Sequence, residues 1–254
     1  MPRPSAKDLT DLHAADAYQA HPYFEARRDL SALRRSDFNR RADTLERLLG
    51  RPLKGARVVE VGCDRGDFVD FLKSERGAIA SGFDVAPLAV QEGRGAGRDV
   101  QLSTLEDAGI ETASVDAVCA YDLIEHVADP AAFLGEAARV LGRGGALAVE
   151  TPNFDGFVYR LGRVLARVRP AANAMSSLQE RLWPPVHVQY FTGRSIVALL
   201  TRSGFEGARC SGRELHIEEV AGMNPLLKIA VGGAFAFGAM AGAPTILSVE
   251  ARRR

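Results

Sequence analysis

The sequence predicts an α/β fold in which helices cover both faces of a doubly wound, mostly parallel sheet. Three observations carry this prediction. Short runs rich in β-branched residues alternate with segments of helical periodicity between residues 57 and 150, which is typical of parallel strands joined by right-handed helical crossovers. A glycine-rich turn follows the first of these runs. Hydrophobic residues make up 46% of the 254 residues, which is enough for one sizeable core.

The alternating part of the chain divides into elements in order. An amphipathic helix over residues 30–49 comes first, because apolar positions recur at helical spacing up to Gly50. Helices over residues 67–73 and 87–92 follow. Asp129 opens another, since an Asp N-cap followed by proline favours a helix start. The expected strands are 57–61, 78–83, 100–102, 115–121 and 146–150.

The alternation breaks after Pro152. We expect an inserted helix with a basic face over residues 154–169, then a helix that is capped by Thr192 and ends at Gly204. Residues 205–215 read as a sixth strand.

Residues 229–249 contain no charged side chain. Their length is close to that of a membrane span, but Pro244 divides them into an apolar helix, 225–242, and a final strand. A helix docked on the protein, peripheral membrane contact through residues 225–249, and a true span all remain open, and the first is favoured.

Composition excludes several classes of function. Lys plus Arg and Asp plus Glu both number 32, so no overall charge attracts nucleic acid, and the crowded N-terminal arginines read as solvated helix faces. The three cysteines are odd in number and widely spaced, which favours a reducing compartment over disulfides or a zinc site. The N-terminal residues lack an apolar signal region, so we expect a cytoplasmic protein. No metal-ligand cluster is recognisable, and no metal site is predicted.

The most informative segment is the turn after the first strand. Glu60 ends an apolar run, and Gly62 and Gly66 let the backbone approach a ligand at the edge of the sheet where ligands bind in such folds. Asp64 and Asp67 would repel a phosphate from the following helix N-terminus. The turn therefore favours a cofactor that carries an amine or a cation over a dinucleotide, and an NAD-linked oxidoreductase is the weaker reading.

The segment Glu60-Val-Gly-Cys-Asp-Arg-Gly66 resembles motif I of the class I S-adenosylmethionine-dependent methyltransferases. Later segments agree in order and spacing: Gly82-Phe-Asp-Val, Asp116 to Pro130, Arg139 to Leu147, Glu150-Thr-Pro-Asn and His187-Val-Gln-Tyr-Phe-Thr. The match covers roughly residues 55–210 and is closest to the branch that modifies small molecules, glycans and lipid-linked intermediates. It implies a seven-stranded, Rossmann-like sheet, an N-terminal helical lid over residues 1–52, and a main domain over residues 53–254 with a substrate-side insertion at 154–190.

The resemblance also implies S-adenosylmethionine as the cofactor. Glu60 and Gly62 would lie against its methionine part, Asp84 would accept hydrogen bonds from both ribose hydroxyls, and Tyr121 would face the sulfonium end. The full set of cofactor residues implied in this way is Glu60, Gly62, Cys63, Gly66, Asp84, Val85, Leu105, Glu106, Tyr121 and Asp122.

The implied reaction is an in-line displacement in which an acceptor atom, most simply an oxygen, attacks the activated methyl group. An alcohol or phenol must also lose a proton, and His126 and His187 are the candidate bases. The acceptor would be a small molecule, a glycan or a lipid-linked compound, and a basic insert (Arg160, Arg163, Arg167, Arg169) could face it. The alternative is a catalytically silent cofactor-binding or membrane-peripheral scaffold. The sequence does not predict the oligomeric state.

Overall fold

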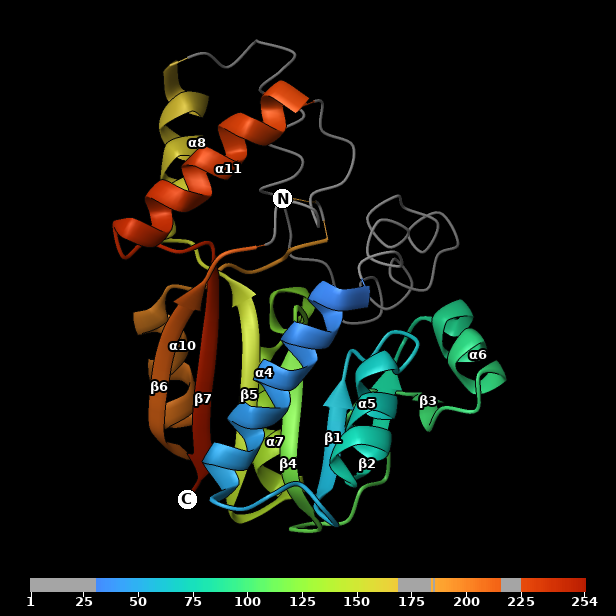
Figure 1. The fold of residues 1–254 in the computed structure, drawn as a ribbon. Coiled ribbons are helices and arrows are strands. Elements are labelled where there is room, and N and C mark those ends of the chain that lie inside the picture. The colour runs from blue at the N-terminus through green and yellow to red at the C-terminus, as the bar shows by residue number, and fades with distance from the viewer. Residues whose placement is uncertain (1–30, 169–183, 185, 216–224) are drawn as a thin grey trace.

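The computed structural model describes residues 31–168, 184, 186–215 and 225–254. Within this part of the chain the strands form a seven-stranded sheet in the order β3-β2-β1-β4-β5-β7-β6 (Figure 1). β1 to β5 pair in parallel, and β7 runs antiparallel to both β5 and β6. The predicted doubly wound, mostly parallel sheet is confirmed. The strands are β1 (Arg57–Val61), β2 (Ile79–Asp84), β3 (Val100–Leu102), β4 (Val115–Tyr121), β5 (Leu141–Pro152), β6 (Phe205–Arg213) and β7 (Ile246–Arg253).

Helices cover both faces of the sheet, as predicted (Figure 1). Asp129 caps α7 by accepting hydrogen bonds from the amides of Ala131 and Ala132, each 3.0 Å long, and Thr192 forms a capping box with Ser195 at the start of α10. One face carries α4 (Ser31–Leu49), α5 (Asp67–Arg76) and α6 (Pro87–Gly95), and the other carries α7 (Pro130–Val140) and α10 (Gly193–Arg202).

Three elements are longer than predicted, and the first is α5, which continues from Lys73 to Arg76. β5 begins at Leu141, because a register shift against β4 between Val115 and Ala117 lets the glycine-rich stretch pair before Ala146. α6 continues through Gly93, where a Cβ would lie 2.6 Å from the Arg65 carbonyl oxygen. Only glycine allows the helix to pass the turn after β1 at that distance.

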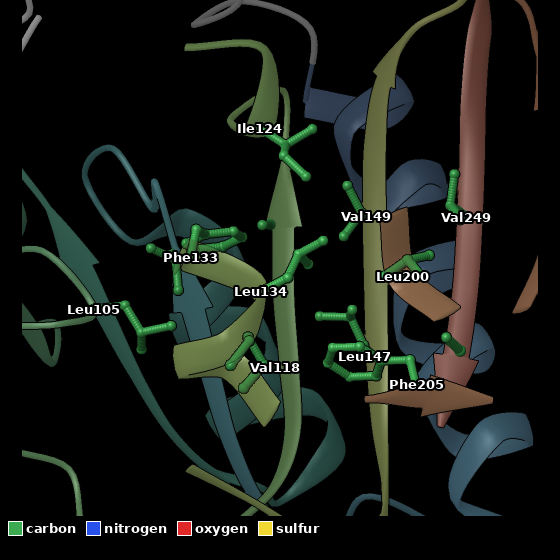
Figure 2. Close-up of a cluster of buried hydrophobic side chains, with 14 of the residues drawn as sticks. Leu105, Val118, Ile124, Phe133, Leu134, Leu147, Val149, Leu200, Phe205 and Val249 are labelled. Carbon is green, nitrogen blue, oxygen red and sulfur yellow. The ribbon is translucent and has the colours of Figure 1, made fainter. Parts of the chain in front are cut away.

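The larger hydrophobic core lies between the sheet and the helices α7 and α10. Figure 2 shows Leu134 and Leu200 from these helices meeting Val118, Leu147 and Phe205 from the strands. All of these side chains are almost fully buried. Each contributes about 1.5–3 kcal/mol of burial free energy, so this face anchors the middle of the sheet.

The opposite face is closed by α4, which buries Ala42 and Leu45 in one cluster with Val58 of β1. Phe68 lies between Phe38 and Tyr121 in this layer. Its ring centre is 5.2 Å from that of Phe38 and 5.7 Å from that of Tyr121. α4, which makes up most of residues 31–52, the described part of the predicted lid, is thus a layer of the main core. Residues 1–30 lie outside the described residues, so the boundary at residue 52 stays a prediction.

Two further helices, α8 (Phe157–Val168) and α11 (Pro225–Met240), pack together beyond the carboxyl ends of the parallel strands (Figure 1). The rings of Phe157 and Phe237 lie 4.6 Å apart between them. α11 is followed by β7, as the docked-helix interpretation predicted. In the described parts of the chain, no helix combines the length and the apolar character that a membrane span requires.

Candidate active site at the carboxyl edge of the sheet

The candidate site is built where β1, β2 and β4 end. Parallel pairing sets Val61 beside Phe83 on one side and beside Ala120 on the other. The segments that follow these strands therefore converge at one edge of the sheet. They contribute the glycine turn, Asp84 and the Tyr121–Asp122 corner.

The glycine turn depends on left-handed backbone at Gly62, Asp64 and Gly66, whose φ angles are 71°, 51° and 74°. A Cβ on Gly66 would lie only 2.4 Å from the Val100 Cγ1 atom, so the glycine there permits close packing of α5 against β3. Asp64 adopts the same conformation without being glycine, which Asp tolerates better than most residues.

The Asp84 carboxylate holds this turn in place. One oxygen accepts a 2.7 Å hydrogen bond from the amide of Asp64, and the other accepts a 2.9 Å bond from the amide of Ala86. Burial raises the pKa of Asp84 to about 6, against the opposing effect of these amides. The predicted ribose-binding residue is thus rigidly positioned.

Glu60 and Tyr121 present buried polar atoms to the same face of the sheet as α4. Glu60 is only 5% exposed, and burial raises its pKa to about 8 although Arg41 opposes the shift. The Glu60 Oε2 atom and the Tyr121 hydroxyl have no hydrogen-bond partner among the described residues. Buried polar atoms of this kind indicate a place for a polar ligand or water.

The other predicted cofactor residues lie around this edge in different roles. The Cys63 side chain is buried, and a Cβ on Gly82 would lie 2.6 Å from its Sγ atom, so the thiol packs against β2. Val85 follows β2 directly, and Leu105 is part of the larger core. The Glu106 side chain is exposed. Asp122 has a φ of 55° and its amide donates to the Glu150 carbonyl, 2.9 Å away.

Asp67 differs from the role expected of it. Its carboxylate pairs with Arg34, Arg65 and Arg98 at 2.8, 3.2 and 2.5 Å. Its charge is compensated within the protein, so the argument that Asp67 would repel a phosphate does not hold. Asp64 carries what is left of that argument, since it has a longer, 3.8 Å contact with Arg65.

A buried ion-pair cluster that the sequence did not reveal lies beside Tyr121. Glu150 is 1% exposed and pairs with Arg40, Arg41 and Arg213 at 2.7, 2.8 and 3.2 Å. Burial alone would raise the pKa of Glu150, but these arginines hold it well below its usual range. The crowded N-terminal arginines were expected on solvated helix faces. Arg41 contradicts this expectation because its side chain is only 11% exposed. Arg35, with a side chain that is 61% exposed, agrees with it.

The two candidate bases lie next to each other although they are far apart in the sequence. His126 ends the short 3-10 helix η1 (Ile124–His126) after β4, and its ring centre lies 4.6 Å from that of His187. Backbone amides of Val188 and Gln189 donate to the Glu125 carbonyl at 3.0 and 3.2 Å. These bonds fasten the segment that carries His187 onto η1.

Glu125 is a third member of this group that the sequence analysis did not single out. Its carboxylate is 1% exposed and accepts a 2.9 Å hydrogen bond from the Thr151 hydroxyl. One nitrogen or oxygen atom from each of Glu125, His126 and His187 lies within 4.8 Å of the others. The sequence signal for this group was an acid, Glu125, directly before a histidine. The approach of His187 could not be predicted in this way, because it depends on the fold.

Comparison with known proteins decides the family. The family model for a "Methyltransferase domain" matches residues 32–209, which is well over half of the chain. The chain belongs to this methyltransferase family.

Relatives of the methyltransferase agree with this assignment. The chain is 37% identical over 109 residues to a ubiquinone biosynthesis O-methyltransferase of Xylella fastidiosa, covering 40% of this chain and 44% of that protein. It is 34% identical over 168 residues to a Mycolicibacterium smegmatis protein named "Probable S-adenosylmethionine-dependent methyltransferase", covering 66% and 58%. The chain thus spans about half the length of the curated relatives that it matches.

Solved structures show the same fold at low identity. A SAM-dependent methyltransferase from Archaeoglobus fulgidus matches with a TM-score of 0.56 and 16% identity, covering 89% of this chain and all of that one. A phosphoethanolamine N-methyltransferase 2 from Haemonchus contortus matches with a TM-score of 0.57, covering 85% and 52%. The predicted Rossmann-like methyltransferase fold is confirmed.

The cofactor of the methyltransferase family is S-adenosylmethionine, and the residues at the sheet edge fit it. The partnerless Glu60 Oε2 atom and Tyr121 hydroxyl offer an acceptor and a donor to its polar groups. Asp84 retains lone pairs beyond its two backbone bonds.

Proposed function

We propose that this methyltransferase transfers the methyl group of S-adenosylmethionine to an oxygen atom of a small-molecule acceptor. The observation that carries the proposal is that two groups of polar residues lie at the carboxyl edge of the sheet. Glu60, the glycine turn and Asp84 follow β1 and β2, while Glu125, His126 and His187 gather after β4. The O-methyltransferase relatives support oxygen as the attacked atom.

In this proposal the residues of β1, β2 and β4 bind and orient the cofactor. Asp84 accepts the ribose hydroxyls, Glu60 faces the methionine ammonium, and Tyr121 and Asp122 face the sulfonium end. The cofactor supplies a methyl group activated by a positively charged sulfur, so the protein mainly aligns the reactants and excludes water.

On the acceptor side, an alcohol or phenol must lose a proton as its oxygen forms the new bond. His126 and His187 are positioned for this role by backbone contacts: the Nδ1 atom of His126 lies 3.1 Å from the Val186 carbonyl, and the amide of His187 donates to the Pro184 carbonyl over 3.0 Å. Either imidazole could accept the proton near neutral pH.

The surface of α8 and α11 bears on which acceptor is methylated: a small molecule, a glycan or a lipid-linked compound. They expose Val164, Ile229 and Met240 to 53%, 73% and 89%. Arg160 and Arg167 are exposed beside them, whereas Arg163 is tied back by a 2.7 Å hydrogen bond to the Phe154 carbonyl. An apolar, basic surface of this kind suits an anionic or lipid-linked acceptor and peripheral contact of a cytoplasmic enzyme with a membrane.

Calorimetric titration with S-adenosylmethionine and its demethylated product tests the cofactor part of the proposal. We expect both to bind the full chain. Binding of neither at millimolar concentration would overturn the proposal, and binding without methylation of any acceptor would favour the silent scaffold. Mass spectrometry of metabolites from cells with and without the gene then identifies the acceptor by the added methyl group.

Membrane contact needs a test that keeps the sheet intact. A chain ending at Asn224 would lack β7, which pairs with both β5 and β6, so shortening the chain is unsuitable. Replacing Ile229 and Met240 by serine in the full chain should reduce flotation with anionic liposomes. Ile79→Ser, at an exposed site on β2, is the control. Equal flotation of all variants would count against contact through α11.

A further inference from the structure

We propose that Glu125, His126 and His187 bind a divalent transition-metal cation that holds the acceptor oxygen in the methyl-transfer reaction. The inference rests on the proposed function and replaces direct proton removal by a histidine with activation of the acceptor on a cation. Two imidazoles and one carboxylate form a donor set that Zn²⁺ and its first-row neighbours prefer, and three protein ligands leave positions open for a substrate oxygen.

The spacing of the ligand atoms suits such a cation after a small adjustment. The atoms lie within 4.8 Å of one another. Two ligand atoms at about 2.1 Å from a tetrahedral ion are about 3.4 Å apart, so side-chain rotations that close the group by roughly 1–1.5 Å suffice.

Contacts outside the cluster orient two of its members as in known metal sites. The Val186 carbonyl can only accept a hydrogen bond, so the 3.1 Å contact with His126 Nδ1 places the ring hydrogen there and the lone pair on Nε2. The Thr151 hydroxyl donates to one oxygen of Glu125, which orients the other oxygen. Metal-bound histidines and carboxylates are held by partners of this kind.

Tyr190 supplies an independent indication that a ligand belongs here. Its hydroxyl is buried and has no hydrogen-bond partner among the described residues, and its ring centre lies 5.8 Å from that of His187. A water or acceptor oxygen on the cation would give this hydroxyl a partner.

The chemical step balances with this site. The cation lowers the pKa of the bound acceptor hydroxyl, whose proton leaves to solvent. A lone pair of the resulting oxygen forms the bond to the methyl carbon. The carbon–sulfur bond breaks with its electron pair on sulfur, which becomes neutral. The cation is neither oxidised nor reduced.

Binding of Co²⁺ alone to the full chain tests the site, because bound Co²⁺ absorbs visible light according to its ligands. We expect one equivalent to bind with a ligand-field spectrum, competition by Zn²⁺, and a rise in melting temperature. Glu125→Gln, His187→Gln and His126→Asn should each weaken binding at least tenfold. His126→Asn retains a donor for the Val186 carbonyl and so separates loss of a ligand from loss of that contact.

Glu206→Gln, an exposed change on β6, is the matched control and should leave Co²⁺ binding unchanged. Titration with S-adenosylmethionine reports whether each variant is folded and tests the proposed function separately. Cofactor binding without Co²⁺ binding would overturn the metal site and leave the proposed function standing. Equal Co²⁺ affinity of the wild type and the three cluster variants would also overturn it.

Activity provides a second readout once an acceptor is known. Removal of metal by a chelator should abolish methylation, and added Zn²⁺ or Mn²⁺ should restore it. Full activity of the chelated enzyme would mean that a histidine acts directly as the base, contrary to this proposal.

Discussion

Arg41 of α4 donates hydrogen bonds of 2.8 and 3.2 Å to a single carboxylate oxygen of Glu150 on β5. The same guanidinium lies 3.9 Å from the centre of the Tyr121 ring. An ion pair from a helix to a buried strand end thus borders the predicted sulfonium end of the cofactor site.

This pair predicts a large stability loss in Glu150→Gln. The change leaves Arg41 and Arg213 buried beside a neutral amide, and breaking a buried pair costs about 3–5 kcal/mol. Glu75→Gln is the matched control, because Glu75 also pairs with an α4 arginine, Arg35, but both side chains are exposed. It should cost less than about 1 kcal/mol. Urea denaturation measures both, and equal losses would show that the burial of Glu150 contributes nothing.

Gly66→Ala tests how closely the turn must pack. The new Cβ would meet Val100 at 2.4 Å in left-handed backbone, for which we expect a loss of about 2–5 kcal/mol. Gly97→Ala imposes similar backbone strain at a φ of 77° but meets no atom within 4 Å. It should cost only about 1 kcal/mol. A smaller loss for Gly66→Ala than for Gly97→Ala would contradict the packing argument.

Asp84→Asn should weaken S-adenosylmethionine binding at least tenfold. An amide nitrogen would replace one of the oxygens that accept the Asp64 and Ala86 amides, so the turn would be disturbed and a ribose acceptor lost. Asp99→Asn, whose exposed carboxylate pairs with Lys73 at 3.5 Å, is the control for calorimetry. Unchanged affinity in Asp84→Asn would remove Asp84 from the cofactor site.

The raised pKa of Glu60 predicts how stability depends on pH. Its folded-state pKa of about 8 lies above the ordinary value of 4.5, so the folded protein binds more protons than the unfolded chain between these pH values. Stability should therefore fall as pH rises through that window, by an amount on the order of a few kcal/mol. Glu60→Gln should reduce this slope in urea denaturation at pH 6 and pH 8.5 without abolishing it, because burial also raises the pKa of Glu125 to about 8.

The same carboxyl group couples cofactor binding to protons. If ionised Glu60 faces the cofactor ammonium, binding near pH 7 releases a proton. Calorimetry in buffers of different ionisation enthalpy should detect this release in the wild type and a smaller one in Glu60→Gln. Identical proton release in both proteins would mean that Glu60 does not contact the ammonium.

Local patterns predicted most of the fold. The β1, β3 and β4 boundaries agree with the predicted ranges, because β-branched runs there are bounded by turn residues. Asp129, Thr192 and Gly50 marked helix ends through their own backbone and side-chain preferences. The extra length of β5 was missed, since it depends on a register shift against β4 rather than on local sequence.

The site was less predictable where it depends on distant pairing. Asp84 and the glycine turn carry their roles in short motifs. Glu150, by contrast, becomes an ion-pair centre only because Arg41 comes from a helix more than one hundred positions earlier. His187 joins Glu125 and His126 through backbone bonds between segments sixty residues apart, which no spacing in the sequence indicates.

The antiparallel strand β7 has a consequence for how the molecule forms. β6 joins the sheet through β7 alone in the described structure, and β7 follows it in the chain. During synthesis on the ribosome, β6 must therefore wait without a pairing strand until residues 246–253 emerge and insert beside β5. Its unpaired edge is open to intermolecular association in that interval.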